Sequence, residues 1–192
     1  DWHCVEDRFP VVPLTMLIEI MKAAAIRISP RRRLRAVEHL RAYKWLVVEP
    51  AVDITVVAKR VDADHIRVQI EGYCECLVVF GDAYAKPPKP SPLRPDPTDL
   101  PLIGGRQLYD ERWMFHGPAY QGIQTLTGLT KNGICGRLRN LQALGGLLDN
   151  AGQLLGYWVM VNTEVDRLAM PFMVEGMEWF GPEPEAEATL DC

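Results

Sequence analysis

Hydrophobic positions near the start of the chain follow a helical period. Between residues 13 and 25 the apolar side chains recur three or four residues apart, at Leu14, Leu17, Ile18, Met21 and Ala25. This spacing places them on one face of a helix. Pro13 suits a first helical turn, and Pro30 prevents a simple continuation. The pattern predicts one amphipathic helix over residues 13–25.

From residue 37 to residue 84 the pattern changes to that of strands. Apolar and polar residues alternate over 52–58 and 66–70, and Asp62-Ala63-Asp64 falls between these runs as a turn. Residues 74–80 are apolar enough for a strand that is buried on both faces. The sequence therefore predicts one helix followed by an antiparallel meander.

A proline-rich stretch then divides the chain. Seven prolines lie within residues 87–101. Proline lacks the backbone N–H that a sheet requires and favours extended polyproline geometry. We therefore interpret 1–86 as an N-terminal half, 87–103 as a linker and 104–192 as a C-terminal half.

The C-terminal half repeats the same kinds of element. We expect a short helix near 107–114, strands near 123–129 and 134–138, a long apolar helix at about 141–160, and strand-like pieces near 173–180. Asn132-Gly133 is a typical hairpin turn. Each half has one buried helix and several antiparallel strands, so the predicted fold class is α+β.

Composition, charge and cysteine spacing argue against several classes of protein. The chain is 48% hydrophobic and 24% charged, with a net charge of −4, which is ordinary for a globular protein and disfavours nucleic acid as the main partner. Residues 141–161 contain Asp149 and several glycines, which favours a buried helix over a membrane span. Five irregularly spaced cysteines argue against a disulfide framework, and no secretory signal is visible. We expect a soluble, cytoplasmic protein.

The apolar stretch 141–161 contains one charged residue, Asp149. A buried carboxyl group without a partner is often kept protonated. Gln153 lies four residues further on, on the same helix face. Two interpretations stay open at this point: a polar strip that serves a reaction, or a helix-packing seam with one satisfied aspartate.

His3 is a second candidate, because it precedes the turn that opens the first helix. A histidine there could act as a general base, with backbone N–H groups nearby to hold an oxyanion. His39, His65 and His116 carry no such signal, and no pair of residues has metal-ligand spacing. Serine-hydrolase elbows, phosphate-binding loops and dinucleotide fingerprints are absent.

Four segments of the chain, which include His3 and Asp149, resemble the motifs of the dehydratase domains of polyketide synthases and polyunsaturated-fatty-acid synthases, and they occur in the same order. The family carries H-x-x-x-G-x-x-x-x-P, then Y-G-P-x-F and L-P-F elements, with D-x-x-x-Q or D-x-x-x-H on a central helix. The matching segments are His3–Pro13, Phe115–Tyr120, Asp149–Gln153 and Leu168–Phe172. The resemblance implies a double hotdog fold, in which two antiparallel sheets each wrap a central helix.

The first motif departs from the family pattern at two positions. Asp7 stands in place of the glycine, and the proline falls one position late, at Pro13. The carboxylate of Asp7 would oppose a developing negative charge unless it points away from the oxyanion site. The chain is also short for the family, so we expect that leading strands and some loops are absent from it.

The resemblance implies a mechanism. Neutral His3 would remove the C2 proton of a 3-hydroxyacyl thioester, and protonated Asp149 would protonate the leaving hydroxyl to give the trans-2-enoyl thioester. Gln153 would orient Asp149 or the hydroxyl. The remaining positions implied to contact the substrate are Tyr120, Pro118, Gly117, Asp7 and Pro13. No metal or diffusible cofactor is expected.

The implied partners are an acyl carrier protein, which carries the substrate on phosphopantetheine, other synthase domains of the same polypeptide, and a second copy of a dimeric parent synthase. Alternatives on the same fold are a double-bond-shifting isomerase, a product-template cyclase and a non-catalytic acyl-binding domain. The irregular first motif favours the last of these, whereas Asp149 favours dehydration. A stand-alone hotdog thioesterase fits less well, because both halves are expected in one chain.

Overall fold

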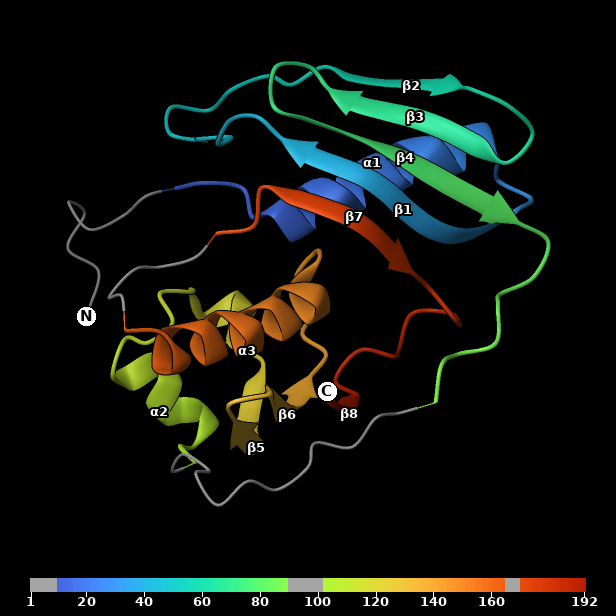
Figure 1. Cartoon of the computed structure of the whole chain (residues 1–192). Coiled ribbons are helices and arrows are strands. Elements are labelled where there is room, and N and C mark those ends of the chain that lie inside the picture. Colours follow the sequence, from blue (N-terminus) through green and yellow to red (C-terminus); the bar gives the residue numbers. More distant parts are fainter. Residues whose placement is uncertain (1–9, 90–101, 165–169) are drawn as a thin grey trace. The chain divides into compact units, whose positions relative to one another are not determined.

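The computed structural model describes residues 10–89, 102–164 and 170–192 and divides the chain into two compact units (Figure 1). Unit 1 contains Asp1–Pro87 and Pro171–Pro182. Unit 2 contains Pro88–Met170 and Glu183–Cys192. The expected linker 87–103 falls mostly outside the described residues, as does the first motif up to residue 9.

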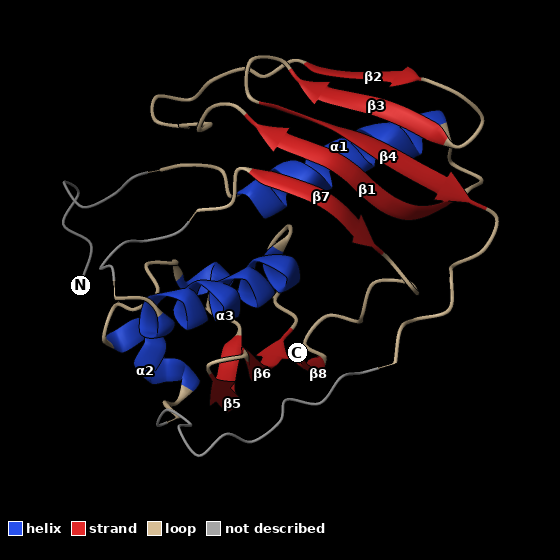
Figure 2. Ribbon diagram, in the orientation of Figure 1, coloured by secondary structure: helices blue, strands red, loops and turns tan. Residues whose placement is uncertain are grey.

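Unit 1 is one helix, α1 (Leu14–Ile28), lying against a five-stranded antiparallel sheet (Figure 2). The strand order is β2-β3-β4-β1-β7. The strands are β1 (Arg33–Ala42), β2 (Val56–Arg60), β3 (His65–Ile70), β4 (Cys74–Gly81) and β7 (Met173–Glu178). Because β1 pairs with β4 and not with β2, the sheet is not the simple meander that the sequence suggested.

The apolar face of α1 is the one that the sequence predicts. Leu17, Ile18, Met21 and Ala25 are buried. Pro13 is the residue before the first turn, and the helix ends at Ile28, just before Ser29 and Pro30. A proline at residue 30 disfavours helical geometry in the residue before it, which explains this end.

Two thiols of β4 pack against α1. The Sγ atoms of Cys74 and Cys76 lie 3.8 and 3.6 Å from the Sδ atom of Met21. Residues two apart in a strand share a face, which places both thiols on the side of the sheet that α1 covers. Burial raises the pKa of the Cys74 thiol to about 11 and that of Cys76 to about 12, so both stay protonated as small core side chains.

The predicted segments do form strands, but some strands begin or end at other residues than the sequence predicted. The turn before β3 forms as expected, with Oδ1 of Asp62 accepting hydrogen bonds from the backbone N–H groups of Asp64 and His65. The alternating residues 52–54 lie outside the strands, since β2 begins at Val56. In β4, fully buried and half-buried positions alternate, so the expectation of complete burial on both faces was wrong.

The last segment of the chain corrects our division into halves. We expected 104–192 to form one half, yet β7 pairs antiparallel with β1 of unit 1, with Ala36 opposite Glu178 and Arg41 opposite Met173. The physical reason is that β4 occupies only one edge of β1. The other edge presents unpaired N–H and C=O groups, and β7 satisfies them.

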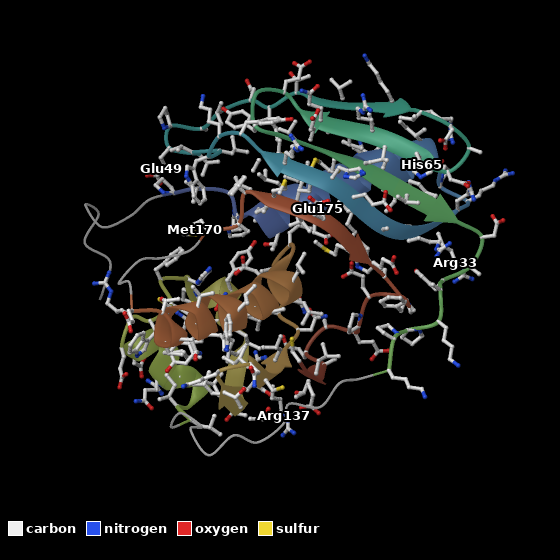
Figure 3. The ribbon with its side chains drawn as sticks, viewed as in Figure 1. Arg33, Glu49, His65, Arg137, Met170 and Glu175 are labelled. Carbon is white, nitrogen blue, oxygen red and sulfur yellow. The ribbon has the colours of Figure 1, made fainter. Side chains whose placement is uncertain are left out.

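Unit 2 is a smaller version of the same plan, with helix α3 against a three-stranded antiparallel sheet of order β5-β6-β8. Its elements are α2 (Gly105–Asp110), the short 3-10 helix η2 (Pro118–Tyr120), β5 (Ile123–Thr130), β6 (Gly133–Arg139), α3 (Gly146–Asn162) and β8 (Thr189–Asp191). Arg137 of β6, labelled in Figure 3, pairs with Asp191 of β8.

Two local predictions for unit 2 are shifted. The hairpin turn consists of Lys131 and Asn132, because Gly133 already pairs with Thr130. Helix α3 begins at Gly146 and not near residue 141, since Gly145 has a left-handed φ of 75° that interrupts helical geometry. Within the described residues, no helix is long and apolar enough to cross a membrane.

The burial of α1 generates a stability prediction that two isoleucines can test. Ile18 is 1% exposed and Ile26 of the same helix is 42% exposed. Ile18→Ala should lower the free energy of unfolding by about 2–5 kcal/mol, because it leaves a cavity. Ile26→Ala should cost less than about 1 kcal/mol. Urea denaturation measures both, and equal losses would contradict the assignment of the helix face.

Candidate active site

Asp149 lies in the first turn of α3, where its backbone N–H donates to the carbonyl oxygen of Gly145 at 2.9 Å. Its side chain is 10% exposed. The sequence left two interpretations of Asp149 open, a reactive polar strip or a helix-packing seam, and the groups that surround the carboxyl group decide between them.

Gln153 is the residue that fixes the carboxyl group. Its amide Nε2 donates to Oδ2 of Asp149 at 2.8 Å and to the backbone carbonyl of Tyr120 at 2.9 Å. A carbonyl oxygen can only accept, so this second bond determines which end of the amide carries the N–H groups. Oδ2 of Asp149 is therefore an acceptor.

Tyr109 of α2 holds the other end of the same amide. Its hydroxyl lies 3.0 Å from Oε1 of Gln153 and 3.4 Å from Oδ1 of Asn150, and it accepts from the backbone N–H of Ile123. Having one hydrogen, the hydroxyl donates best to the nearer oxygen, that of Gln153. Burial raises the pKa of Tyr109 to about 12, so the group remains a donor at neutral pH.

Asn150 ties the start of α3 to β5. It is fully buried, accepts from the backbone N–H of Gly122 at 2.7 Å and donates to the carbonyl of Gly146 at 2.6 Å. A Cβ atom at residue 122 would come within 2.7 Å of the Asn150 amide nitrogen. The approach of the two chain segments therefore requires glycine at this position.

His116 also reaches Asp149, and the sequence did not single it out. Its Nε2 lies 3.4 Å from Oδ2 of Asp149, and its ring stacks on Phe115 with centroids 4.5 Å apart. Burial lowers the pKa of His116, an effect that the charge of Asp149 opposes. Burial being the larger effect, the imidazole is neutral near neutral pH. The sequence could have indicated His116, because it lies directly before Gly117-Pro118 within the motif Phe115–Tyr120.

Other predicted site residues of unit 2 lie beside this cluster. Gly117 and Pro118 are exposed where η2 begins. Tyr120 is half-buried, and its hydroxyl donates to the carbonyl of Leu144 at 2.8 Å. Burial, and the nearby charge of Asp149, raise the pKa of Tyr120. The structure thus brings Asp149, Gln153 and Tyr120 together and adds Tyr109, Asn150 and His116.

The first half contributes three predicted site residues, His3, Asp7 and Pro13. His3 and Asp7 lie outside the described residues. Pro13 is described in unit 1, at the start of α1. In the ranges 10–89, 102–164 and 170–192, no three His, Cys, Asp or Glu side chains are grouped as a metal site would need.

A cavity of about 340 Å³ lies beside a different face of α3. Ala151, Leu154, Leu155 and Trp158 contribute to its lining, together with residues of the hairpin turn and Cys192. None of the residues of the Asp149 cluster lines it. The cavity is therefore separate from the candidate site.

Comparison with known sequences finds a relative that is part of a large synthase. No family model matches the chain. A polyunsaturated fatty acid synthase polypeptide of Thraustochytrium sp. is 21% identical over 150 residues, which cover 72% of this chain. The chain spans 5% of the length of that polypeptide.

Solved structures with the same fold are dehydratase domains. The domain from the CurF module of the curacin polyketide synthase has a TM-score of 0.68 at 16% identity, covering 94% of this chain and 72% of that one. The dehydratase domain of PpsC from Mycobacterium tuberculosis, in complex with C12:1-CoA, has a TM-score of 0.56 at 24% identity, covering 77% and 59%.

Structures of two inactive variants of the CurK dehydratase are also similar to this chain. One has histidine replaced by phenylalanine and the other has aspartate replaced by asparagine, with TM-scores of 0.63 and 0.62. Both are 16% identical to this chain and cover 94% of it, and the chain covers 70% of each. The chain therefore has the double hotdog fold of polyketide synthase dehydratase domains, as its motifs predicted.

Tyr109 tests whether the cluster contributes to stability. Tyr109→Phe removes the donor to Gln153 and the acceptor for the N–H of Ile123, leaving buried polar groups unpaired. The free energy of unfolding should fall by about 1–3 kcal/mol. Tyr43→Phe removes an exposed hydroxyl that donates to Glu75 and should change little. Denaturant unfolding compares the two, and equal effects would contradict a structural role for the buried cluster.

Proposed function

We propose that this chain is the dehydratase domain of a polyketide or polyunsaturated-fatty-acid synthase. It removes water from a 3-hydroxyacyl thioester and yields the trans-2-enoyl thioester. The observation that carries the proposal is the Asp149–Gln153 pair on α3, a carboxyl group held by an amide within a fold shared with dehydratase domains.

The proton donor in this reaction is Asp149. Hydroxide is a poor leaving group, so a carboxylic acid must protonate the 3-hydroxyl as its bond to carbon breaks. Gln153 and Tyr109 hold the carboxyl group in one orientation, which removes the cost of arranging it during the reaction. The inactivity of the CurK variant with asparagine in place of aspartate supports a carboxyl group in this role.

The proton acceptor is His3, which takes the C2 proton as the electron pair of that C–H bond forms the double bond. Water leaves with the proton of Asp149, so the residues end as an imidazolium and a carboxylate and exchange protons with solvent before the next turnover. The two side chains suffice for this chemistry. The inactivity of the CurK histidine variant supports a histidine in the reaction.

The acyl group arrives on the phosphopantetheine arm of an acyl carrier protein, in the proposed setting of a cytoplasmic, dimeric, multidomain synthase. The relative found by sequence is part of a polyunsaturated fatty acid synthase. The PpsC domain was solved with an acyl-CoA, a thioester of the same chemical class. These likenesses support a thioester substrate for this chain.

Replacing either proposed catalytic residue should abolish dehydration and preserve the fold. His3→Ala and Asp149→Asn should each lower kcat for a 3-hydroxyacyl-carrier substrate by about 10²–10⁴-fold, because each removes one proton transfer. Mass spectrometry of the acyl group follows the loss of water. Full turnover by either variant would overturn the assignment of roles.

Matched controls separate chemistry from folding. Asp110→Asn changes an exposed aspartate of α2 that pairs with Arg106, and His65→Ala changes a histidine of β3. Both should retain wild-type kcat. Supplying the wild-type chain with a trans-2-enoyl thioester distinguishes the isomerase alternative. Migration of the double bond, without hydration or dehydration, would replace our proposal with that one.

A further inference from the structure

Two side-chain nitrogens of unit 2 lie near Oδ2 of Asp149. The Nε2–H of Gln153 donates to it at 2.8 Å, and Nε2 of His116 lies 3.4 Å away. The orientation of the Gln153 amide is fixed by its bond to the carbonyl of Tyr120. The next point is which ring nitrogen of His116, Nδ1 or Nε2, carries the hydrogen.

The surroundings of His116 answer it. Its Nδ1 atom is buried and has no hydrogen-bond partner among the described residues. A neutral imidazole carries one N–H and one lone pair. Placing the hydrogen on Nδ1 would bury an unpaired N–H group, and such groups are rarer in folded proteins than unpaired acceptors. The favoured tautomer therefore has the hydrogen on Nε2, the ring nitrogen that lies 3.4 Å from Oδ2 of Asp149.

We propose that His116 is a positioning residue for Asp149. Its Nε2 and the Nε2–H of Gln153 both lie beside Oδ2, so both can respond to the charge that this carboxyl group gains when it gives up its proton. This inference rests on the proposed function for its catalytic meaning. In the step it serves, the O–H bond of the Asp149 carboxyl group breaks, the proton goes to the leaving hydroxyl oxygen, and the electron pair stays on the carboxylate.

The contribution of His116 grows as that charge develops. A distance of 3.4 Å between Nε2 and Oδ2 is long for a hydrogen bond to a neutral acid. Hydrogen bonds to an ionised carboxylate are shorter and roughly twice as strong. An interaction that strengthens as the proton leaves favours the transition state over the bound substrate. His116 therefore acts on kcat and not on KM.

Besides His116, two phenols whose pKa is raised by burial lie close enough for the charge of Asp149 to raise that pKa further. Tyr109 faces it from α2 and Tyr120 from η2, and both have a raised pKa. They stay neutral below about pH 9. Among these groups, His116 is thus the one whose tautomer and charge can vary near neutral pH.

Steady-state kinetics on the full chain test the positioning role. His116→Phe keeps a flat ring beside Phe115 and removes the N–H donor, so kcat should fall by about 10- to 100-fold with KM changed by less than about threefold. His116→Gln places an amide N–H at a similar reach and should recover kcat to within about threefold of wild type. His65→Phe, on β3, should match wild type.

Nitrogen NMR of the imidazoles provides a readout that needs no turnover. In alkaline solution His116 should carry its hydrogen on Nε2. His65, labelled in Figure 3, serves as an internal reference. Its Nδ1 lies 2.8 Å from Oδ1 of Asp62, so it should carry its hydrogen on Nδ1. If the wild-type chain dehydrates no substrate, the proposed function is wrong. The NMR experiment would still show which nitrogen of His116 carries the hydrogen.

Two results would overturn the inference. One is an Nδ1–H tautomer at His116. The other is a His116→Gln variant that folds, by its circular dichroism and melting temperature, and yet is as slow as His116→Phe, since a donor at Nε2 would then be irrelevant. A misfolded His116→Phe variant leaves the tautomer and the activity of His116→Gln to decide the question.

Discussion

The bond from the Gln153 amide to Oδ2 of Asp149 is the interaction on which the site depends. Amide orientation is fixed at both ends, by the hydroxyl of Tyr109 and by the carbonyl of Tyr120. Because α2, η2 and α3 each supply one partner, the carboxyl group is held by tertiary structure and not by its own helix alone. A half-satisfied buried network would destabilise unit 2, so these elements must form together.

The same network explains features of the fold that would otherwise look unrelated. Gly145 ends the preceding loop with a left-handed φ, so that α3 begins where Asp149 falls in its first turn. Gly122 lets β5 approach the start of α3 closely enough for the Asn150 bond. Helix α3 itself is held against the sheet by apolar side chains such as Leu154. Packing positions the helix, and the polar cluster positions the acid.

Sequence patterns predicted what depends on local periodicity and motif order. The buried face of α1, the antiparallel strands and the pair Asp149–Gln153 follow from spacing along the chain. The membership of β7 in the sheet of unit 1 depends on a free strand edge distant in sequence, which no local pattern encodes. His116 lies within a motif that the sequence did show, but its role was missed because only folding places its imidazole beside Asp149.

The central claim is that the carboxyl group of Asp149 protonates the leaving hydroxyl of a 3-hydroxyacyl thioester. A crystal structure with an unreactive 3-hydroxyacyl amide analogue would test it most directly. The claim predicts the 3-hydroxyl at about 3 Å from a carboxyl oxygen of Asp149, with C2 facing the imidazole of His3. An analogue bound with its hydroxyl out of reach of Asp149, even through one water, would contradict it.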